Sequence, residues 1–267
     1  MARPHVRCFG KALNERSFMK VTAIIPARMG SSRFPGKPIA PLLGRPMIEH
    51  VYKRTAMSKA LTDVFVATCD EEIKSAVEGF GGRAVMTADT HERASDRIAE
   101  AAQNLDADIV VLVQGDEPMT VAAMIDAAVA PFADDDSIQC VNLTKRINNE
   151  SDFVDPNTIK VIMDQNNDAL FMSRQPVPTR PGGDFSMIRA YKQVCIIPFR
   201  LEALNRYTEL APTPMEVAES IDMMRFLENG IPVRMVETDY DSQAVDTPND
   251  LARVEKLMMD DPLCKTY

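Results

Sequence analysis

Short apolar runs and longer amphipathic stretches alternate along the first half of the chain. Three of the runs are rich in β-branched residues and have the length of a single strand: 21–25, 64–68 and 109–113. Helical spacing between them predicts helices over 46–58, 71–80 and 95–105. Strands that alternate with helices pair in parallel, because a parallel crossover needs a dozen or more residues. The near-continuous apolar character of the runs predicts a sheet covered on both faces. We therefore predict an α/β fold with a doubly wound, mostly parallel sheet.

The second half of the chain has a different pattern. We expect strands at 141–144, 159–163 and 169–172, a proline-rich stretch at 176–183, a strand at 194–198, helices at 201–207 and 214–229, and a strand at 233–236. Pro214 and Glu216 suit the first turn of the second helix, and Gly230 suits its end. Thr247 is the expected N-cap of a terminal helix. The proline-rich stretch is consistent with a mobile loop over a pocket, with a dimerisation arm, or with a solvated connector.

Composition argues against two classes of partner. The 267 residues carry a formal net charge of −9, whereas a general nucleic-acid binder needs a basic face. The mean hydropathy is −0.16. No apolar run approaches the ~18 residues that suggest a membrane span. We therefore expect neither nucleic acid nor membrane as a partner.

The start of the chain and its cysteines bear on where the protein resides. Residues 1–20 are polar and basic and lack the apolar core of a signal peptide. Because Met19 stands directly before the first strand, we interpret these residues as a disordered extension or the product of an upstream start. The five cysteines are scattered, without C-x-x-C or zinc-like histidine spacing. Such cysteines indicate free thiols in a reducing compartment, which predicts a cytoplasmic protein.

The segment 27–37, A-R-M-G-S-S-R-F-P-G-K, follows the first predicted strand. It gathers the cations Arg28, Arg33 and Lys37 with two serines and two glycines. Glycines let backbone N–H groups approach an anion, arginine offers a planar fork to phosphate oxygens, and lysine offers a mobile point charge. The turn after a parallel strand is also the usual ligand crevice of such sheets. The order of residues is not that of a Walker loop. A basic surface loop is the alternative, but the pattern favours a triphosphate site.

Two aspartates, one after a predicted strand and one before a predicted helix, have positions that suit a metal site. Asp116 lies in V-Q-G-D-E-P directly after a predicted strand, and Asp246 lies just before the terminal helix. An acidic residue that faces a triphosphate needs a bridging cation. Mg²⁺ bound by one or two carboxylates and by phosphate oxygens meets that need. Asp246 alone is also consistent with an ordinary helix cap, but paired with Asp116 at one crevice it predicts a magnesium site.

Five blocks occur in a fixed order along the chain. They are R-x-x-S-x-R-x-P-G-K-P at 28–38, H-x-x-x-[ST]-[DE]-R at 91–97, V-Q-G-D-E-P at 113–118, D-P-N-x-[IV]-K-V at 155–161, and V-D-T-P-x-D-L at 245–251. This order resembles the 3-deoxy-manno-octulosonate (Kdo) cytidylyltransferases, also called CMP-Kdo synthetases. The similarity spans about residues 21–258.

The resemblance implies a nucleotide-diphospho-sugar-transferase-like, Rossmann-like α/β fold with an inserted dimerisation and acceptor subdomain. Residues 21–267 would form one domain, with a nucleotide-binding half at 21–138, an acceptor and dimerisation part at 139–232, and a closing strand and helix with the metal aspartate at 233–267. The implied reaction transfers CMP from CTP to an acidic sugar and releases pyrophosphate. The implied enzyme is a homodimer of lipopolysaccharide biosynthesis.

The resemblance also assigns roles to residues. The catalytic set would be Arg28, Lys37, Asp116 and Asp246, with Mg²⁺ on the two aspartates. The nucleotide would be held by Ala27, Arg28, Ser31, Ser32, Arg33, Lys37, Arg93, Ala94 and Gln114. The acceptor would lie near Gln114, Arg174, Gln193, Ile197 and Met223. No dedicated base is required, because metal coordination can lower the pKa of the attacking hydroxyl.

Several of these positions depart from the family pattern. Arg93 stands where the family usually carries a serine, so it could contact the triphosphate, contact an acidic acceptor, or simply face solvent. Gln193, Ile197 and Met223 replace a histidine, a tyrosine and a glutamine that would contact the sugar. A site built to bond hydroxyls loses affinity when such partners vanish. Arg174 matches a retained family arginine that could pair with an acceptor carboxylate.

Three hypotheses follow. The leading one is cytidylyl transfer to Kdo or a related acidic sugar. The second is the same chemistry on a different acid, such as another nonulosonate or octulosonate, or a small phosphonate or carboxylate. The third is a non-catalytic nucleotide-binding paralogue, and the intact Arg28, Lys37, Asp116 and Asp246 argue against it.

Overall fold

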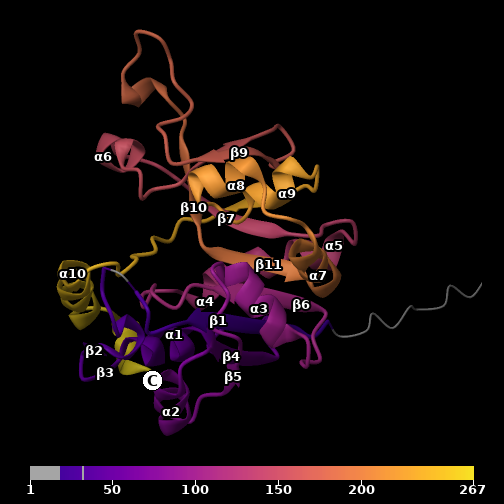
Figure 1. Cartoon of the computed structure of the whole chain (residues 1–267). Helices are drawn as coiled ribbons and strands as arrows, with labels where there is room; N and C mark the ends of the chain where they lie inside the picture. The colour runs from indigo at the N-terminus through magenta and orange to yellow at the C-terminus, as the bar shows by residue number, and fades with distance from the viewer. Residues whose placement is uncertain (1–18, 32) are drawn as a thin grey trace, which may run out of the picture.

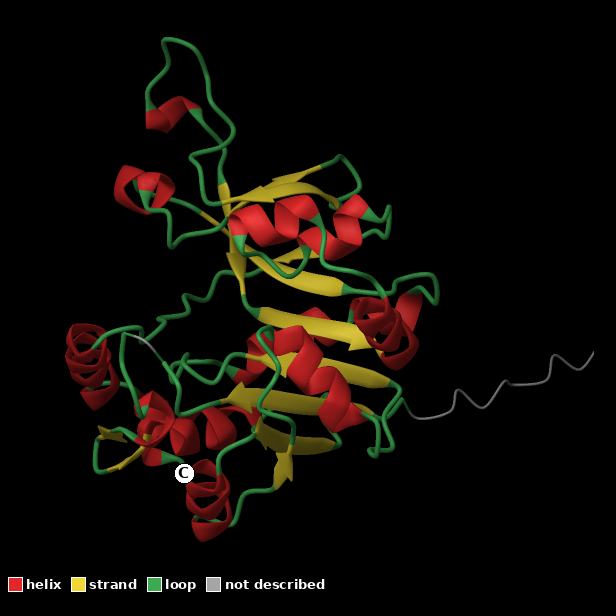
Figure 2. Cartoon of the chain, in the orientation of Figure 1, coloured by secondary structure: helices red, strands yellow, loops and turns green. Residues whose placement is uncertain are grey.

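The computed structural model describes residues 19–31 and 33–267, and its strands form two five-stranded sheets (Figures 1 and 2). The first sheet has the strand order β11-β6-β1-β4-β5. Its parallel strands are β1 (Val21–Ala27), β4 (Asp63–Thr68), β5 (Ala84–Met86) and β6 (Ile109–Val113), and β11 (Ile196–Arg200) is antiparallel at one edge. The three predicted strands of the first half are confirmed. The short β5 escaped prediction because only three residues form it.

Helices cover both faces of the first sheet. One face packs against α1 (Met47–Thr55), α2 (Glu71–Gly79) and α4 (Ala122–Val129), and the other packs against α3 (Ala94–Ala102) and α7 (Leu201–Glu209). A short α5 (Pro131–Asp134) follows α4. Successive residues of β1 alternate between the two cores: Ala23 and Ile25 face the first, and Ile24 faces the second. This double burial explains the continuous apolar runs and confirms the doubly wound α/β prediction.

The second sheet, with the order β12-β7-β10-β8-β9, is mostly antiparallel. Its strands are β7 (Val141–Arg146), β8 (Lys160–Met163), β9 (Ala169–Ser173), β10 (Tyr191–Val194) and β12 (Arg234–Glu237), and α6 (Glu150–Val154) and a 3₁₀ turn η2 (Phe185–Met187) lie in its connections. The strand predicted at 194–198 is two strands: β10 belongs to this sheet and β11 to the first, with Cys195 between them. The uninterrupted apolar sequence hid the change of sheet.

The prediction of a single helix at 214–229 was wrong. The segment forms two short helices, α8 (Pro214–Glu219) and α9 (Met224–Glu228). Ser220 between them has a left-handed backbone with φ of 53°, which a helix cannot include. The start is as predicted, since Thr213 and Glu216 form a capping box before Pro214. The break directs the turn 220–223 toward the first turn of α3, where Asp222 accepts a hydrogen bond from Ser95.

The terminal helix α10 (Pro248–Met259) is capped by Thr247, as predicted, in a reciprocal capping box with Asp250. A short turn η3 (Pro262–Lys265) then leads to the C-terminal residue, Tyr267, which packs against α1. A small hairpin of β2 (Pro41–Leu42) and β3 (Arg45–Pro46) precedes α1. The end of the chain therefore braces the segment that follows the predicted triphosphate loop.

Some expectations concern residues that the structure does not describe. Residues 1–18 of the predicted N-terminal extension and Cys8 lie outside the described residues. Lys20 is described, and its backbone N–H donates to Asp108 at 2.8 Å. The four described cysteines are free, as predicted. Among the described residues, no helix combines the length and apolar character that crossing a membrane would require. The division of the domain after residues 138 and 232 into a nucleotide-binding half, an acceptor and dimerisation part and a closing part stays a prediction.

His50 on α1 yields a prediction about stability. Its buried Nε2 lies 2.8 Å from the carbonyl oxygen of Leu42, which only accepts, so Nδ1 accepts from the Tyr267 hydroxyl at 2.9 Å. Burial is the main reason that the pKa of His50 is lowered from its ordinary value. The unfolded chain therefore binds the proton first as pH falls. We expect the free energy of unfolding to decrease as pH drops below about 6.5.

The measurement is urea unfolding of the native sequence and of His50→Gln at pH 8 and pH 5. The glutamine variant keeps a donor for Leu42 and cannot titrate, so it should lose less stability between the two pH values than the native chain. An equal loss in both proteins would contradict the assignment.

Candidate active site

The loop after β1 folds back on itself around one carbonyl. The Met29 carbonyl oxygen accepts from the N–H of Ser31 at 2.9 Å and from that of Gly36 at 3.1 Å. Gly36 has φ of 73°, a left-handed conformation that glycine adopts without a steric penalty. Lys37 then opens the turn η1 (Lys37–Ile39). The loop thus turns the three cations predicted to bind phosphate toward one side.

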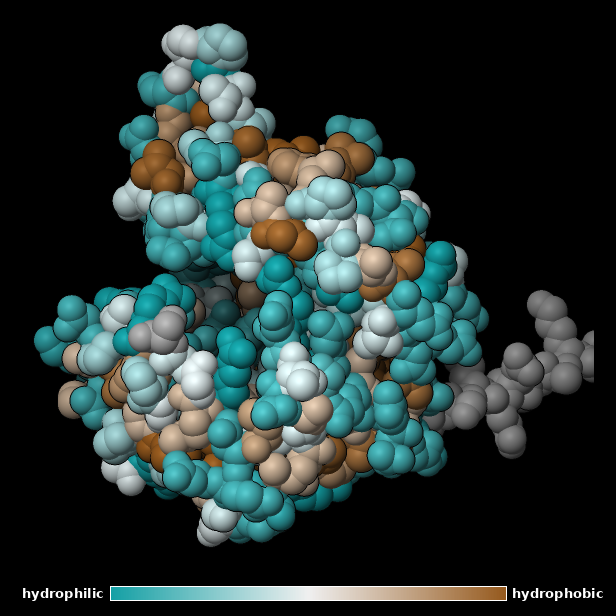
Figure 3. All heavy atoms as spheres, viewed as in Figure 1, coloured by the Kyte–Doolittle hydropathy of each residue, from teal (hydrophilic) through white to brown (hydrophobic). Residues whose placement is uncertain are grey.

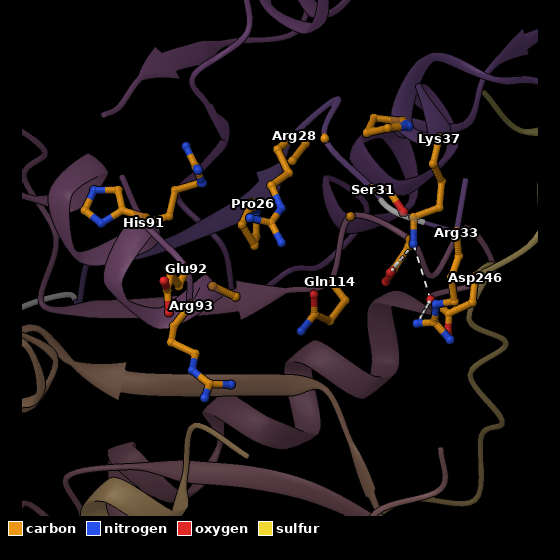
Figure 4. A pocket seen from close by; sticks show the side chains of 17 residues that line it. Pro26, Arg28, Ser31, Arg33, Lys37, His91, Glu92, Arg93, Gln114 and Asp246 are labelled. Carbon is orange, nitrogen blue, oxygen red and sulfur yellow. Dashed lines mark hydrogen bonds and ion pairs between the residues drawn. The ribbon is translucent and has the colours of Figure 1, made fainter. Parts of the chain in front are cut away.

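These cations line a cavity of about 430 Å³ at the carboxyl ends of β1 and β6. Its lining includes Ala27, Arg28, Ser31, Arg33, Lys37, Arg93, Ala94, Gln114, Asp116 and Asp246, so it brings together every described residue predicted to hold the nucleotide or metal. Ser32, also predicted there, lies outside the described residues. Arg28 is exposed and forms no ion pair within the described part of the chain, which leaves its guanidinium free for an anion (Figure 4).

Two carboxylates meet at one ammonium group in this cavity. Lys37 Nζ lies 2.7 Å from Asp116 Oδ2 and 3.6 Å from Asp246 Oδ1, and Arg33 Nη2 lies 2.9 Å from Asp246 Oδ1 (Figure 4). The backbone holds the same arrangement, because the N–H of Val245 donates to the carbonyl oxygen of Asp116 at 2.9 Å. Residues 130 positions apart are therefore fixed side by side, as the sequence predicted. No cluster of three or more metal-ligating side chains occurs among the described residues.

Gly115 in the V-Q-G-D-E-P block has a physical reason to be glycine. A Cβ atom at this position would lie 2.6 Å from the carbonyl oxygen of Pro26 in β1. Any side chain would therefore push the ends of β1 and β6 apart. Gln114 and Asp116, which line the cavity on either side of Gly115, would move with them.

A second cavity of about 750 Å³ continues from the first and shares Arg33, Arg93, Gln114 and Asp116 with it. Figure 3 shows the surface hollowed between the parts over α10 and α6, with a largely hydrophilic rim. Of the predicted acceptor residues, Gln114, Arg174, Gln193 and Ile197 line this second cavity.

Met223 does not line either cavity. Its side chain is fully buried in the core between the first sheet and the α8–α9 pair, with its sulfur 3.8 Å from that of Cys140. The apolar side chain turns inward because the helix breaks at Ser220, and Asp222 faces the cavity instead. The predicted place of Met223 at the acceptor is corrected accordingly.

The other acceptor residues are held by polar contacts. Arg174 donates through Nε to the carbonyl oxygen of Glu219 at 2.7 Å and through Nη1 to that of Pro156 at 3.0 Å. The Gln193 amide donates to the buried Asn142 at 2.6 Å, which directs its nitrogen away from the cavity. Arg174 therefore braces two loops of the cavity wall, in addition to any ligand contact.

Sequence reasoning missed three residues at the second cavity. Lys160 is fully buried beneath it and donates to the carbonyl oxygens of Asp155, Thr158 and Arg174 at 2.5 to 2.8 Å. Burial lowers the pKa of Lys160 from its ordinary value. The available signal was the D-P-N-x-[IV]-K-V block, which places this lysine within a predicted strand, where β8 begins in the structure.

Glu117 and Asp222 are the other two. Glu117 is buried, its Oε2 has no hydrogen-bond partner among the described residues, and burial raises its pKa to about 7. Asp222 lies in the turn after α8, and burial likewise raises its pKa. Neither residue stood out in the sequence. Glu117 adjoins Asp116, which has the clearer pattern, and Asp222 lay inside the single helix that was predicted at 214–229.

Comparison with known proteins decides the family. The cytidylyltransferase family profile matches residues 22–238. The chain belongs to the cytidylyltransferase family. The 3-deoxy-manno-octulosonate cytidylyltransferase of Geobacter metallireducens is 47% identical to this cytidylyltransferase over 249 residues, which cover 90% of this chain and 98% of that protein. The protein of the same name from Geobacter sulfurreducens is 45% identical over 249 residues, covering 90% of this chain and 100% of that protein.

Solved structures agree with this placement of the cytidylyltransferase. A CMP:2-keto-3-deoxy-manno-octonic acid synthetase in complex with CTP matches with a TM-score of 0.84 and 36% identity, over 90% of this chain and 98% of that one. A cytidylyltransferase from Leptospira borgpetersenii shares the fold, with a TM-score of 0.62 at 20% identity over 90% of this chain and 87% of that one. The resemblance, the fold class and the nucleotidyltransferase class predicted from the sequence are confirmed.

Gly115 provides a test of the cavity's geometry. Gly115→Ala should destabilise the cytidylyltransferase by about 1–3 kcal/mol through overpacking. Displacement of Asp116 should lower its turnover roughly 10²-fold. Gly79→Ala is the matched control, since a Cβ there meets nothing within 4 Å. Urea unfolding and pyrophosphate release would measure both effects, and full activity in Gly115→Ala would contradict the close approach of β6 to β1.

Proposed function

We propose that this cytidylyltransferase transfers CMP from CTP to Kdo or a related acidic sugar and releases pyrophosphate. The observation that carries the proposal is the meeting of Lys37, Asp116 and Asp246 where the two cavities join. A triphosphate cavity on one side of these groups and a larger polar cavity on the other supply the two substrate positions that the reaction needs. The relatives' names and the CTP complex support the identity of both substrates.

The residues of the first cavity fit the chemistry of a bound Mg²⁺. Asp116 and Asp246 present hard carboxylate oxygens to one point, where Lys37 now lies, and two carboxylates with phosphate oxygens are a usual Mg²⁺ environment. These two aspartates would hold the ion, and Lys37 would bind the phosphates. When bound, the ion supplies charge neutralisation at phosphate and acidifies the attacking hydroxyl.

The chain's own residues carry the rest of the mechanism. Arg28, Arg33 and Lys37 bind the phosphates and orient the α-phosphorus toward the second cavity. The anomeric hydroxyl oxygen of the acceptor forms a bond to the α-phosphorus as the bond to the bridging oxygen of pyrophosphate breaks, and the hydroxyl proton passes to solvent. The same cations neutralise the charge that develops on the departing pyrophosphate.

Replacing either of the two aspartates proposed to bind Mg²⁺ tests the predicted catalytic residues. Asp116→Asn and Asp246→Asn should each lower Mg²⁺-dependent turnover by about 10²-fold or more, because the amide carries no charge to hold the ion. Thermal melting should show that both variants remain folded. Asp63→Asn, which removes a carboxylate paired with Arg83 far from the cavities, should keep native activity. Full activity in both cavity variants would contradict the assignment.

The identity of the acceptor rests on the second cavity. The side chain of Ile197 offers no hydrogen bond, and the amide nitrogen of Gln193 already donates to Asn142. This cavity therefore has fewer hydrogen-bonding groups for sugar hydroxyls than the family pattern implies. The smaller number of hydrogen-bonding groups favours a second candidate function, which is the same transfer to another nonulosonate or octulosonate, or to a small phosphonate or carboxylate.

A pyrophosphate-release screen separates the candidates. Four nucleoside triphosphates are each combined with Mg²⁺ and a panel of acidic sugars and small acids. We expect turnover with CTP and Kdo or a close relative. Turnover with CTP and only an unrelated acid would favour the second candidate. The absence of both turnover and Mg²⁺-dependent CTP binding would favour the non-catalytic paralogue.

We also propose that the enzyme is a cytoplasmic homodimer without nucleic-acid or membrane partners. Large apolar side chains exposed in the second half of the chain, Val154, Leu170, Met187, Met215 and Val217, support a protein interface there. The segment around η2, which stands away from the rest of the chain in Figure 1, is a candidate dimerisation arm. The net charge of −9 and the free cysteines support the remaining assignments.

A further inference from the structure

Polar contacts join the start of α3 to the turn between α8 and α9 at the wall of the second cavity. Arg93 Nη1 donates to Ser220 Oγ at 2.8 Å, and Ser95 Oγ donates to Asp222 Oδ2 at 2.9 Å. We call these four residues, Arg93, Ser95, Ser220 and Asp222, the α3–α9 clasp. Arg93 and Asp222 both line the second cavity, so the clasp borders the proposed acceptor position.

The side chain of Arg93 is directed away from the triphosphate loop. Figure 4 shows its guanidinium pointing away from Arg28 and Lys37, toward the second half of the chain. Its nearest carboxylate oxygens are Asp222 Oδ1 at 3.7 Å and Glu216 Oε1 at 3.8 Å. This arginine therefore contributes its charge to the acceptor side of the junction, although its backbone opens the helix that borders the first cavity.

The two carboxylates near Arg93 are not equivalent. Glu216 is fully buried and is held by Arg225, which bonds both of its oxygens at 2.6 and 2.7 Å. Asp222 has no comparable partner, and Arg93 is the nearest cation to its Oδ1. That oxygen receives no hydrogen bond from the described residues, and the side chain keeps 20% of its exposure. Asp222 thus presents a charged acceptor oxygen to the cavity.

The position of Asp222 depends on the turn that carries it. Ser220 has a left-handed backbone, and the N–H groups of Ser220 and Ile221 both donate to the carbonyl oxygen of Glu216. Side chains from other elements then fix the turn from outside. Arg93, directly before α3, holds it through the hydroxyl of Ser220, and Arg174, directly after β9, holds it through the carbonyl oxygens of Glu219 and Ser220. Removal of Arg93 would release one side of the turn and leave Asp222 without a nearby cation.

We propose that Arg93 is a positioning residue, which fixes the turn 220–222 so that Asp222 accepts a hydrogen bond from a hydroxyl group of the acceptor. This inference rests on the proposed function. An acceptor carboxylate is a poor ligand for Arg93, because it would meet Asp222 and Glu216 within 4 Å of the same guanidinium. The clasp therefore recognises a hydrogen-bond donor, and the carboxylate of the acceptor lies elsewhere in the cavity.

Steady-state kinetics on the full chain tests this role with Arg93→Met, Asp222→Asn and the double variant. Each single change should raise KM for the acceptor roughly tenfold, since each removes or misplaces a hydrogen bond to a charged group. KM for CTP should change less than twofold. The double variant should be no worse than Asp222→Asn alone, because Arg93 acts through Asp222. Arg93→Lys keeps the charge and should recover part of the loss.

Controls separate this role from a purely structural one. Arg83→Met removes an exposed arginine far from the cavities and should leave both KM values unchanged. Thermal melting verifies that each variant is folded under the assay conditions, and Arg93→Lys serves in place of Arg93→Met if the latter does not fold.

Three results would overturn the inference in an enzyme whose native form is active. The first is an unchanged KM for the acceptor in Arg93→Met, and the second is a raised KM for CTP in that variant. The third is a KM for the acceptor in the double variant that rises by the product of the two single effects. The last would mean that Arg93 contacts a substrate itself. A native chain that turns over no acid would contradict the proposed function, and this inference with it.

Discussion

The ends of β1 and β6 and the segment before α10 are held together at one point, and the site depends on that constraint. Three chain segments distant in sequence meet there: the loop that carries Lys37, the block that carries Asp116, and the strand-to-helix connection that carries Asp246. A backbone hydrogen bond from Val245 to Asp116 and the missing side chain of Gly115 make the approach possible. The ammonium of Lys37 compensates two carboxylates that would otherwise repel each other.

The second consequence of the fold is the position of the proposed acceptor cavity. The chain leaves the first sheet after β6, builds the antiparallel strands β7 to β10 of the second sheet, and returns to the edge of the first through β11. The strand β12 joins the second sheet later, parallel to β7. Because β10 and β11 are separated only by Cys195, the larger cavity lies directly beside the first cavity. Two substrates placed in the two cavities would meet at the carboxylate pair. This proximity is what a transfer between a triphosphate and a hydroxyl requires.

The sequence carried most of the information about the first cavity and little about the second. Doubly buried strands and the A-R-M-G-S-S-R-F-P-G-K loop are local patterns, so the sheet, Arg28, Lys37 and Asp116 could be predicted. The place of Asp246 also followed, since Thr247 has the pattern of a helix cap. The second cavity is made by long-range events: a change of sheet at Cys195 and a left-handed Ser220 that breaks a helix. Both lie inside sequences that read as continuous elements, which is why Met223 was placed at the acceptor and Asp222 was overlooked.

A crystal structure of the enzyme with CTP, and with Mn²⁺ as a substitute for Mg²⁺, tests directly whether Asp116 and Asp246 bind the metal. We expect an anomalous peak bound by Asp116, Asp246 and phosphate oxygens, with Lys37 moved from the aspartates to the triphosphate. A manganese ion bound away from both aspartates, with Lys37 still paired to them while CTP is present, would contradict this assignment.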